Sequence, residues 1–301
     1  MTDDAYLAVI NPAAGGGRCG KRFPAALERL REGGLEVETA QTSGPGEATE
    51  LVREAWAQGR RRFIAVGGDG TGYEVVNGLF PLAADSEHRP VLGFLPLGTG
   101  NSFLRDFTDQ GAEHTIEALI AGARKTIDVV RMVHEAGQLH YINLLSIGFV
   151  ADVNGLRARR FSRWGEFGYV LSVIAGVLGL KSRIFPMRIE DGELDSSPQV
   201  FCSFNNSKFT GGKMMMAPHA ETDDGTIAVV KVAKMGRWSL LATFPKIFSG
   251  AHISHPAVTT AQAARIDLEL TENIDVMVDG EALEVIPRTL EVVPGALDVV
   301  V

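Results

Sequence analysis

The first 130 residues alternate short apolar runs with amphipathic segments, and every apolar run ends in a loop of glycine and small polar residues. The runs at 6–10, 35–40, 63–66 and 91–95 have the length and composition of strands, whereas "FPAALERLREG" and "GEATELVREAWAQG" have helical periodicity. This alternation predicts a parallel sheet with crossover helices. Because such sheets bind ligands beyond the carboxyl ends of their strands, we expect the loops to meet at one crevice. The four loops are "NPAAGGGRCG", "QTSGPG", "GGDGTG" and "PLGTGN".

The pattern changes after about residue 130, where short strand-like runs follow one another with turn residues between them. Two helical blocks, at 153–180 and around 236–249, interrupt these runs. This pattern is typical of antiparallel strands packed as a sandwich or open barrel. We therefore expect an α/β domain with a parallel sheet over 1–130, and a mostly β, sandwich-like domain over 131–301. Residues 290–301 are expected to pack back on the first domain.

The net charge of −8 argues against a nucleic-acid binder, because a phosphate backbone requires a basic face that neutralises many charges at once. One basic cluster stands out, the segment "RARRFSRW" with Arg157, Arg159, Arg160 and Arg163. Its pattern fits a solvated helix face, and it also fits contact with phosphate or lipid headgroups.

Several features favour a reduced, cytoplasmic protein. Cys19 and Cys202 lie far apart and match no metal-binding spacing. The N-terminus "MTDDAYLAVINP" is acidic and enters a strand-like run directly, unlike a signal peptide. The apolar block at 167–180 is shorter than the roughly 20 residues that cross a bilayer. This block is expected to form a buried helix, although a helix that lines an apolar cavity or touches a membrane would have the same composition.

The loop "GGDGTG" has the composition of a phosphate-binding turn. Gly67, Gly68 and Gly70 leave backbone N–H groups uncovered, and Thr71 with the following helix start adds donors and the positive end of a helix dipole. Asp69 is the exception, since a carboxylate repels phosphate unless a metal ion or a hydroxyl group lies between them. A glycine turn after a strand is also common without any ligand.

A second loop, after the fourth strand, repeats this composition with Gly98, Thr99, Gly100 and Asn101. The loop after the first strand adds Asn11 and a flexible turn that could lie along a nucleoside. None of these loops is a Walker A motif, because no Gly-Lys-Ser/Thr follows. The loops at 67–72 and 98–101 are not a Rossmann fingerprint either, because its Gly-x-Gly-x-x-Gly belongs in the first strand-to-helix turn.

Six motifs in order along the chain resemble those of the diacylglycerol kinase and sphingosine kinase superfamily of lipid kinases. They are "NPAAGG", "GGDGTGYEVVNGL", "LGFLPLGTGNSFLRDF", "IGFVADV", "APHAETDDGTIAVV" and "VDGE". The resemblance implies two domains with an ATP site in the cleft between them, dependence on Mg²⁺, and phosphorylation of a lipid hydroxyl group. It also implies a peripheral membrane protein that acts at the inner face of the membrane. The oligomeric state stays open, a homodimer included.

The resemblance assigns roles to individual residues. It places a structural Mg²⁺ beside the "DDG" turn, held by Asp224 with backbone carbonyls near Glu221 and Thr226; a plain turn between strands is the alternative. It assigns the lipid's polar head to Asp152, which hints at a sphingoid or ceramide-like acceptor. The nucleotide contacts fall on Asn11, Pro12, Gly15, Thr42, Gly67, Gly68, Asp69, Gly70, Thr71, Glu74, Gly98, Thr99, Gly100 and Asn101.

The same resemblance places the chemistry on three carboxylates. Glu281 or Asp279 of the "DGE" motif is the base that takes the acceptor's proton, and Asp69 orients Mg²⁺ or that same hydroxyl group. The chain departs from the family at Gly72 and Tyr73, where Leu or Ile and then Asn or His are usual. This departure predicts a looser helix start and a differently shaped acceptor pocket.

Two other functions stay open. An NAD kinase shares "GGDGT" and phosphorylates a ribose hydroxyl, although the "PLGTGN" loop and the apolar block at 167–180 favour a lipid. A regulator that binds lipid or nucleotide without catalysis is the second, and the intact carboxylates argue against it.

Overall fold

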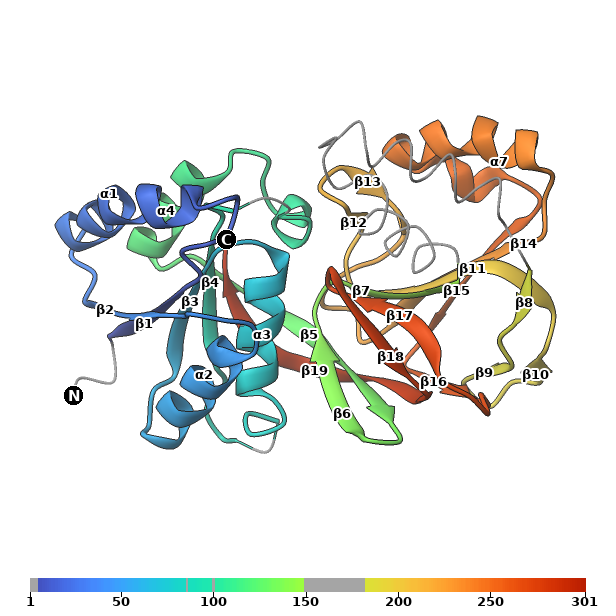
Figure 1. Ribbon diagram of the computed structural model, residues 1–301, viewed down its shortest axis with the longest axis horizontal. Helices are drawn as coiled ribbons and strands as arrows, with labels where there is room; N and C mark the ends of the chain where they lie inside the picture. The colour runs from blue at the N-terminus through green and yellow to red at the C-terminus, as the bar shows by residue number, and fades with distance from the viewer. Residues whose placement is uncertain (1–4, 85, 99–100, 149–181) are drawn as a thin grey trace.

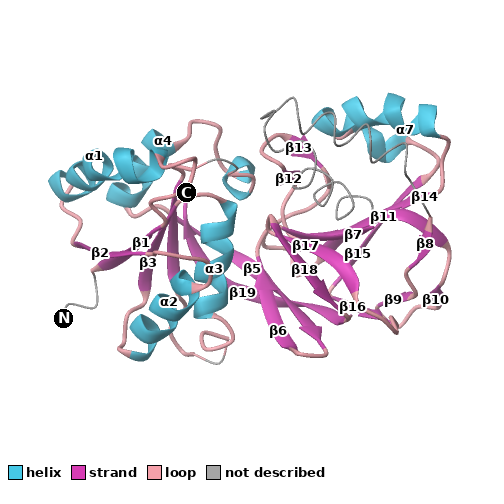
Figure 2. Cartoon of the chain, viewed as in Figure 1, coloured by secondary structure: helices cyan, strands magenta, loops and turns pink. Residues whose placement is uncertain are grey.

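The computed structural model has two domains side by side, an α/β domain and a domain built mostly of antiparallel strands (Figures 1 and 2). It describes residues 5–84, 86–98, 101–148 and 182–301. This architecture confirms the fold class predicted from the alternation in the first half of the sequence and the short strands in the second.

The first domain contains a parallel sheet with the strand order β2-β1-β3-β4-β19. The order reverses between β1 and β3, so the loops after these two strands diverge from each other. Open α/β sheets bind their ligands at such a point. The strands that precede the loops are β1 (Tyr6–Ile10), β2 (Val37–Gln41), β3 (Arg62–Val66) and β4 (Val91–Leu95).

Helices cover both faces of this sheet (Figure 1). Successive side chains of β1 point to opposite faces of the sheet, so each face has apolar residues for a helix layer to cover. Ala8 and Ile10 pack on the face covered by α1 and α4, whereas Val9 packs on the face covered by α2 and α3. The helices are α1 (Arg18–Glu32), α2 (Glu47–Ala57), α3 (Asp69–Leu79) and α4 (Ala112–Ala121). The short η1 (Phe103–Asp106) lies between β4 and α4 along the chain.

Two long strands belong to both domains. β5 (Arg124–His134) and β19 (Pro287–Val300) pair antiparallel along their length. The end of β19 pairs parallel with β4, whereas its first half pairs antiparallel with β16 (Arg265–Leu268). Residues 298–300 therefore complete the sheet of the first domain, and no single residue divides the two domains.

The second domain packs two sheets face to face. One has the order β15-β14-β11-β7-β17-β18 with β8 beside β11, and the other continues from β19 through β16, β9 and β10, with β5 and β6 beside it. Buried residues of both sheets, such as Met132, Ile147 and Phe204, form one core between them. The remaining strands are β6 (Gly137–Tyr141), β7 (Leu144–Gly148), β8 (Arg183–Ile184), β9 (Met187–Ile189), β10 (Leu194–Asp195), β11 (Pro198–Asn205), β14 (Ile227–Ala233), β15 (Val258–Ala263), β17 (Ile274–Val278) and β18 (Glu281–Val285).

A hairpin and a helical segment complete the second domain. The hairpin pairs β12 (Phe209–Thr210) with β13 (Met214–Met215), and its turn faces the first domain. The helical segment comprises α7 (Arg237–Thr243), η4 (Phe244–Ser249) and η5 (Ala251–Ser254). None of the helices in the described ranges is long and apolar enough to cross a membrane.

Candidate active site

Three of the four predicted loops touch one another at the carboxyl edge of the parallel sheet. The Gly98 N–H donates to the Gly67 carbonyl at 2.9 Å. A Cβ atom on Gly98 would lie 2.9 Å from the Gly67 carbonyl carbon, and one on Gly15 would lie 3.3 Å from the Gly98 Cα. At Gly98 the backbones approach too closely for a side chain, and at Gly15 the tight contact is combined with a left-handed backbone (φ 63°) that favours glycine. The predicted convergence of these loops is therefore present.

Asp69 is the first residue of α3 and is held by a residue that the sequence did not single out. Its carboxylate accepts the Ser102 N–H at 3.0 Å and the Ser102 hydroxyl at 3.0 Å. Burial raises the pKa of Asp69 above its usual range, although these two hydrogen bonds oppose the shift. The carboxylate therefore has a fixed orientation at the start of the helix.

The "DGE" motif forms the turn between β17 and β18, and its two carboxylates have different surroundings. Asp279 has a left-handed backbone (φ 46°) and is 4% exposed. Its oxygens accept the backbone N–H groups of Ile142, Asn143 and Leu144 at 3.0, 3.1 and 2.9 Å. Burial, with a contribution from nearby Asp69, raises the pKa of Asp279 to about 7.

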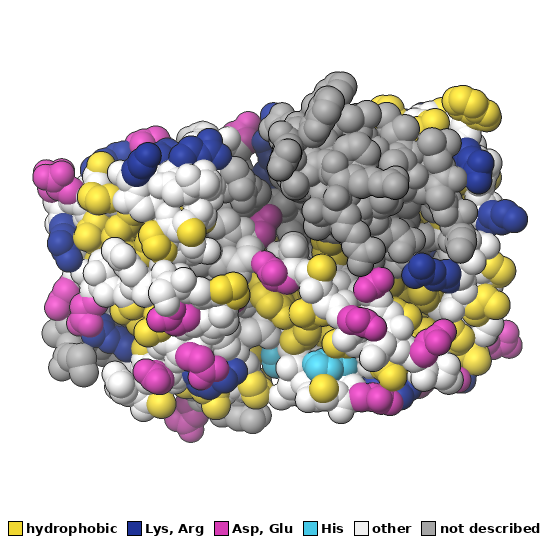
Figure 3. Space-filling model, in the orientation of Figure 1, with side chains coloured by type: hydrophobic (Ala, Val, Ile, Leu, Met, Phe, Trp, Pro, Cys, Tyr) yellow, Lys and Arg dark blue, Asp and Glu magenta, His cyan; other side chains and the backbone are white. Residues whose placement is uncertain are grey.

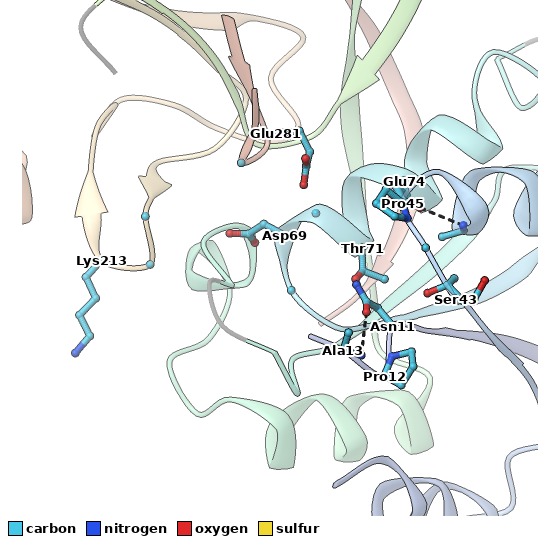
Figure 4. Close-up of a pocket in the computed structure, with 18 of the residues that line it drawn as sticks. Asn11, Pro12, Ala13, Ser43, Pro45, Asp69, Thr71, Glu74, Lys213 and Glu281 are labelled. Atoms are coloured by element: carbon cyan, nitrogen blue, oxygen red, sulfur yellow. Dashed lines mark hydrogen bonds between the residues drawn. The ribbon is translucent and has the colours of Figure 1, made fainter. Parts of the chain in front are cut away.

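Glu281, two residues later, reaches the solvent in the cleft between the domains (Figure 4). Its Oε1 lies so close to the first turn of α3 that a Cβ atom on Gly70 would approach it to 2.5 Å. Partial burial, which removes water from the carboxylate, and the negative charge of Glu74 raise the pKa of Glu281. A carboxylate of the second domain thus lies directly over the glycine-rich turn of the first.

The cleft has a volume of about 1270 Å³ and takes its walls from both domains. On the face seen in Figure 3, acidic side chains lie along the line where the domains meet. Of the predicted residues, Gly15, Gly67, Gly98 and Asn101 are not among those that line the cleft, and Gly67 and Asn101 line a small cavity beside Asp69. Thr99, Gly100 and Asp152 lie outside the described residues. The predicted residues that line the cleft are Asn11, Pro12, Thr42, Gly68, Asp69, Gly70, Thr71, Glu74 and Glu281.

Three of these lining residues also hold the loops in place. Both oxygens of Glu74 accept backbone N–H groups at the start of α2, from Gly46 at 3.0 Å and Ala48 at 3.1 Å. The Asn11 side chain accepts the Ala13 N–H at 3.1 Å, and the Thr42 hydroxyl donates to a backbone carbonyl of β1. Glu74 therefore fixes the loop that lines the cleft, in addition to the nucleotide contact predicted for it.

The departure from the family at Gly72 and Tyr73 does not loosen the helix. Gly72 lies against the Phe94 ring, where a Cβ atom would come within 2.9 Å of the ring, so the absence of a side chain allows close packing. Tyr73 packs against the core of the second domain. Burial and the carboxylates of Asp279, Glu281 and Glu74 raise its pKa to about 12, so its phenol stays protonated at neutral pH.

Hydrogen bonds hold the Asp224 carboxylate of the "DDG" turn. Asp224 Oδ1 accepts both the N–H and the hydroxyl of Thr226 at 2.9 Å, and Oδ2 accepts Gln262 Nε2 at 3.2 Å. The Glu221 side chain pairs with Lys208, whereas the predicted site uses a backbone carbonyl near Glu221. Within the described ranges, no three His, Cys, Asp or Glu side chains are grouped to hold a metal ion. Hydrogen bonds thus account for the Asp224 carboxylate, and a metal here stays a prediction.

The fold and the cleft define a two-domain kinase, with an α/β domain that presents glycine-rich loops and a β sandwich that presents a carboxylate. Residues 5–132 match the model of the diacylglycerol kinase catalytic domain, and residues 143–301 match that of the YegS C-terminal NAD kinase beta sandwich-like domain. The chain belongs to the diacylglycerol kinase superfamily of lipid kinases.

Relatives cover nearly the whole chain. The diacylglycerol kinase of Mycobacterium tuberculosis (strain ATCC 25618 / H37Rv) is 29% identical over 297 residues, which span 97% of this chain and 93% of that protein. The diacylglycerol kinase of Bacillus subtilis (strain 168) is 27% identical, over 91% of this chain and 88% of its own length. A crystal structure of a candidate diacylglycerol kinase from Bacillus anthracis str. Sterne superposes with a TM-score of 0.79 at 26% identity, covering 99% and 97% of the two chains.

Proposed function

We propose that this kinase transfers the γ-phosphoryl group of ATP, as its Mg²⁺ complex, to a hydroxyl group of a lipid. Diacylglycerol and sphingoid or ceramide-like lipids are the acceptor classes. The observation that carries the proposal is the position of Glu281, a residue of the second domain that lies in the cleft directly over the glycine-rich first turn of α3. A phosphoryl group bound by those loops would face a carboxylate able to activate an acceptor.

The nucleotide side of the proposal rests on backbone donors. Gly68, Gly70 and Thr71 line the cleft where α3 begins, so the positive end of the helix dipole lies at the space for phosphates, and the two glycines have no side chains to cover their backbone N–H groups. The loops after β1 and β2 line the same cleft and leave room for the nucleoside. When bound, Mg²⁺ travels with the nucleotide and neutralises charge on its phosphates.

Glu281 is the better candidate for the base. Both oxygens of Asp279 are occupied by three backbone donors, and this residue is buried, whereas Glu281 is open to the cleft. In the proposed step, Glu281 accepts the proton of the lipid hydroxyl group. The hydroxyl oxygen forms a bond to the γ-phosphorus while the bond between the γ-phosphorus and the β-phosphate oxygen breaks, which releases ADP. Asp69 orients the reacting groups, since Ser102 fixes its carboxylate.

Labelled ATP tests the proposal, with diacylglycerol, ceramide, sphingosine and monoacylglycerol offered in mixed micelles and NAD offered in parallel. We expect label in a lipid, and we expect Asp69→Asn and Glu281→Gln to abolish its transfer with the fold intact. Label in NAD alone would establish the NAD kinase alternative. ATP binding with no transfer to any acceptor would favour the regulator that binds without catalysis.

We further propose that the protein works at the inner face of the membrane through local contacts. The candidate contact, Arg157, Arg159, Arg160 and Arg163 followed by the apolar block 167–180, lies outside the described residues, so the proposal rests on sequence alone. Basic residues near an anionic surface contribute on the order of 1 kcal/mol each. Replacing the four arginines with glutamine should reduce sedimentation with anionic vesicles and leave ATP affinity unchanged. Unchanged sedimentation would contradict the proposal and favour the alternative, that the segment is a solvated helix face.

A further inference from the structure

Ser102 connects the two domains at the candidate active site. The residue is 1% exposed, and its hydroxyl donates to Asp69 Oδ2 at 3.0 Å while it accepts the Gly212 N–H at 2.9 Å. Asp69 belongs to α3 of the first domain, and Gly212 belongs to the β12–β13 hairpin of the second. One buried hydroxyl group therefore joins the carboxylate to the hairpin.

A second contact holds the same hairpin. Asp106, at the end of η1, accepts the Lys208 N–H with both of its oxygens, at 3.2 and 3.1 Å. Burial raises the pKa of Asp106, because few water molecules reach this junction. The segment 102–106 of the first domain thus fixes the hairpin at its base and at its turn.

The turn of this hairpin carries a cation that lines the cleft. Among the described residues, the lining includes the carboxylates of Asp69, Glu74 and Glu281, with Lys213 as the single Lys or Arg. Lys213 is exposed, and no ion pair holds its ammonium group within the described part of the chain. Figure 4 shows its side chain extending from the turn away from Asp69 and Glu281. Its long stem is therefore free to rotate toward a bound anion.

Electrostatics makes this lysine significant. A nucleoside triphosphate brings several negative charges into a cleft where the other charged lining residues, within the ranges that the structure describes, are carboxylates. Backbone N–H groups and a helix dipole supply partial charges only, so a mobile ammonium group at the rim offsets charge that they do not.

We propose that the hairpin 211–214 is the second domain's part of the phosphate site, with Lys213 as a ligand of the terminal phosphates. Ser102 is a positioning residue that sets the hairpin relative to Asp69. This inference rests on the proposed use of a nucleotide. It adds residues of the second domain to a site that the sequence motifs confined to the first-domain loops and the "DGE" turn.

Nucleotide binding measured by calorimetry without lipid tests the role of Lys213. Lys213→Gln should weaken ATP binding about tenfold, because one charge-assisted contact is lost, and should leave AMP binding unchanged. The matched control is Lys234→Gln, an exposed lysine just after β14 that does not line the cleft. Wild-type ATP affinity in Lys213→Gln, or equal losses for ATP and AMP, would overturn the assignment.

A double-mutant cycle tests the role of Ser102. Ser102→Ala frees Gly212, so we expect weaker ATP binding, and in its presence Lys213→Gln should cost less than twofold more. Additive losses would overturn the coupling, and unchanged ATP affinity in Ser102→Ala would do the same. Melting curves with and without ATP identify a variant that fails to fold, and Ser102→Cys, which keeps the size of the side chain, then replaces Ser102→Ala. Because calorimetry needs no acceptor, an absence of lipid phosphorylation would refute the proposed function and leave this inference intact.

Discussion

Two Asp-Gly turns of the second domain, at 224–225 and 279–280, have the same dipeptide and opposite surroundings. Asp224 is exposed and bonds to Thr226, two residues away, and to Gln262 on the neighbouring strand. Asp279 is buried and bonds to the backbone of three residues more than 130 positions earlier in the chain. The first turn closes a local structure, whereas the second is anchored to the start of β7.

The anchoring explains why the second turn, and not the first, lines the cleft. Three backbone N–H groups hold the Asp279 carboxylate, so the residue that follows Gly280 is directed into the cleft. Motif text alone groups Asp279 with Glu281 as interchangeable candidates for the base. Their partners separate them: Asp279 is an anchor, and Glu281 is a carboxylate in the cleft, which makes it the candidate for the base.

The largest effect should come from Glu281→Gln. If Glu281 is the base, turnover falls by about 10³-fold, because the amide cannot accept the proton, while the melting temperature is unchanged. Steady-state kinetics with the preferred lipid measures this loss. Glu284→Gln, an exposed carboxylate on the same strand, is the control and should be silent. A drop of less than tenfold in Glu281→Gln would remove the distinction between the two carboxylates.

Asp279→Asn should act on stability and on its pH dependence. Loss of the anchor should lower the free energy of unfolding by about 2 kcal/mol. In the wild type, the folded-state pKa of about 7 lies above the unfolded value, so Asp279 stabilises the fold below pH 4 and this contribution declines as the pH rises toward 7. The decline is about 1.4 kcal/mol per pH unit and should be absent from the variant. Urea unfolding of both proteins at pH 5 and 6 measures it; equal slopes would contradict the assignment.

Gly70→Ala probes the approach of Glu281 to α3. The added Cβ atom meets Glu281 Oε1, so the carboxylate must shift and turnover should fall about tenfold. Stability should hold or rise, because alanine favours helix more than glycine does. Gly44→Ala is the matched control, since Gly44 lines the same cleft and has open space at its Cβ position. Equal activities in the two variants would show that the position of Glu281 is not critical.

Asp224→Ala should have the smallest effect. Loss of the turn's hydrogen bonds should cost about 1 kcal/mol of stability, equally in Mg²⁺ and in a chelator, if hydrogen bonds alone hold the turn. The structural Mg²⁺ implied by the family resemblance instead requires that Mg²⁺ raise the melting temperature of the wild type and not of the variant. Thermal melting of both proteins with and without Mg²⁺ distinguishes these cases.

The sequence predicted the features that depend on local patterns. The spacing of apolar residues gave the two domain types, and glycine after each strand located the loops that meet near Gly98. Ser102 was missed because its partner Asp69 lies 33 positions away, and the burial of Asp279 was missed because it depends on how β17 packs beside β7. Gly72 appeared to weaken its helix because its partner, the Phe94 ring, lies on a different strand. No local pattern reports which distant groups a side chain will meet.

The route of β19 through both domains has a consequence for synthesis. Because residues 298–300 occupy the place beside β4, the parallel sheet of the first domain lacks a strand until these residues have left the ribosome. Until then β4 presents an open edge, and such edges pair readily with other chains. The first domain to be made is thus the last to be completed, and its protection during translation depends on whatever covers β4 in the meantime.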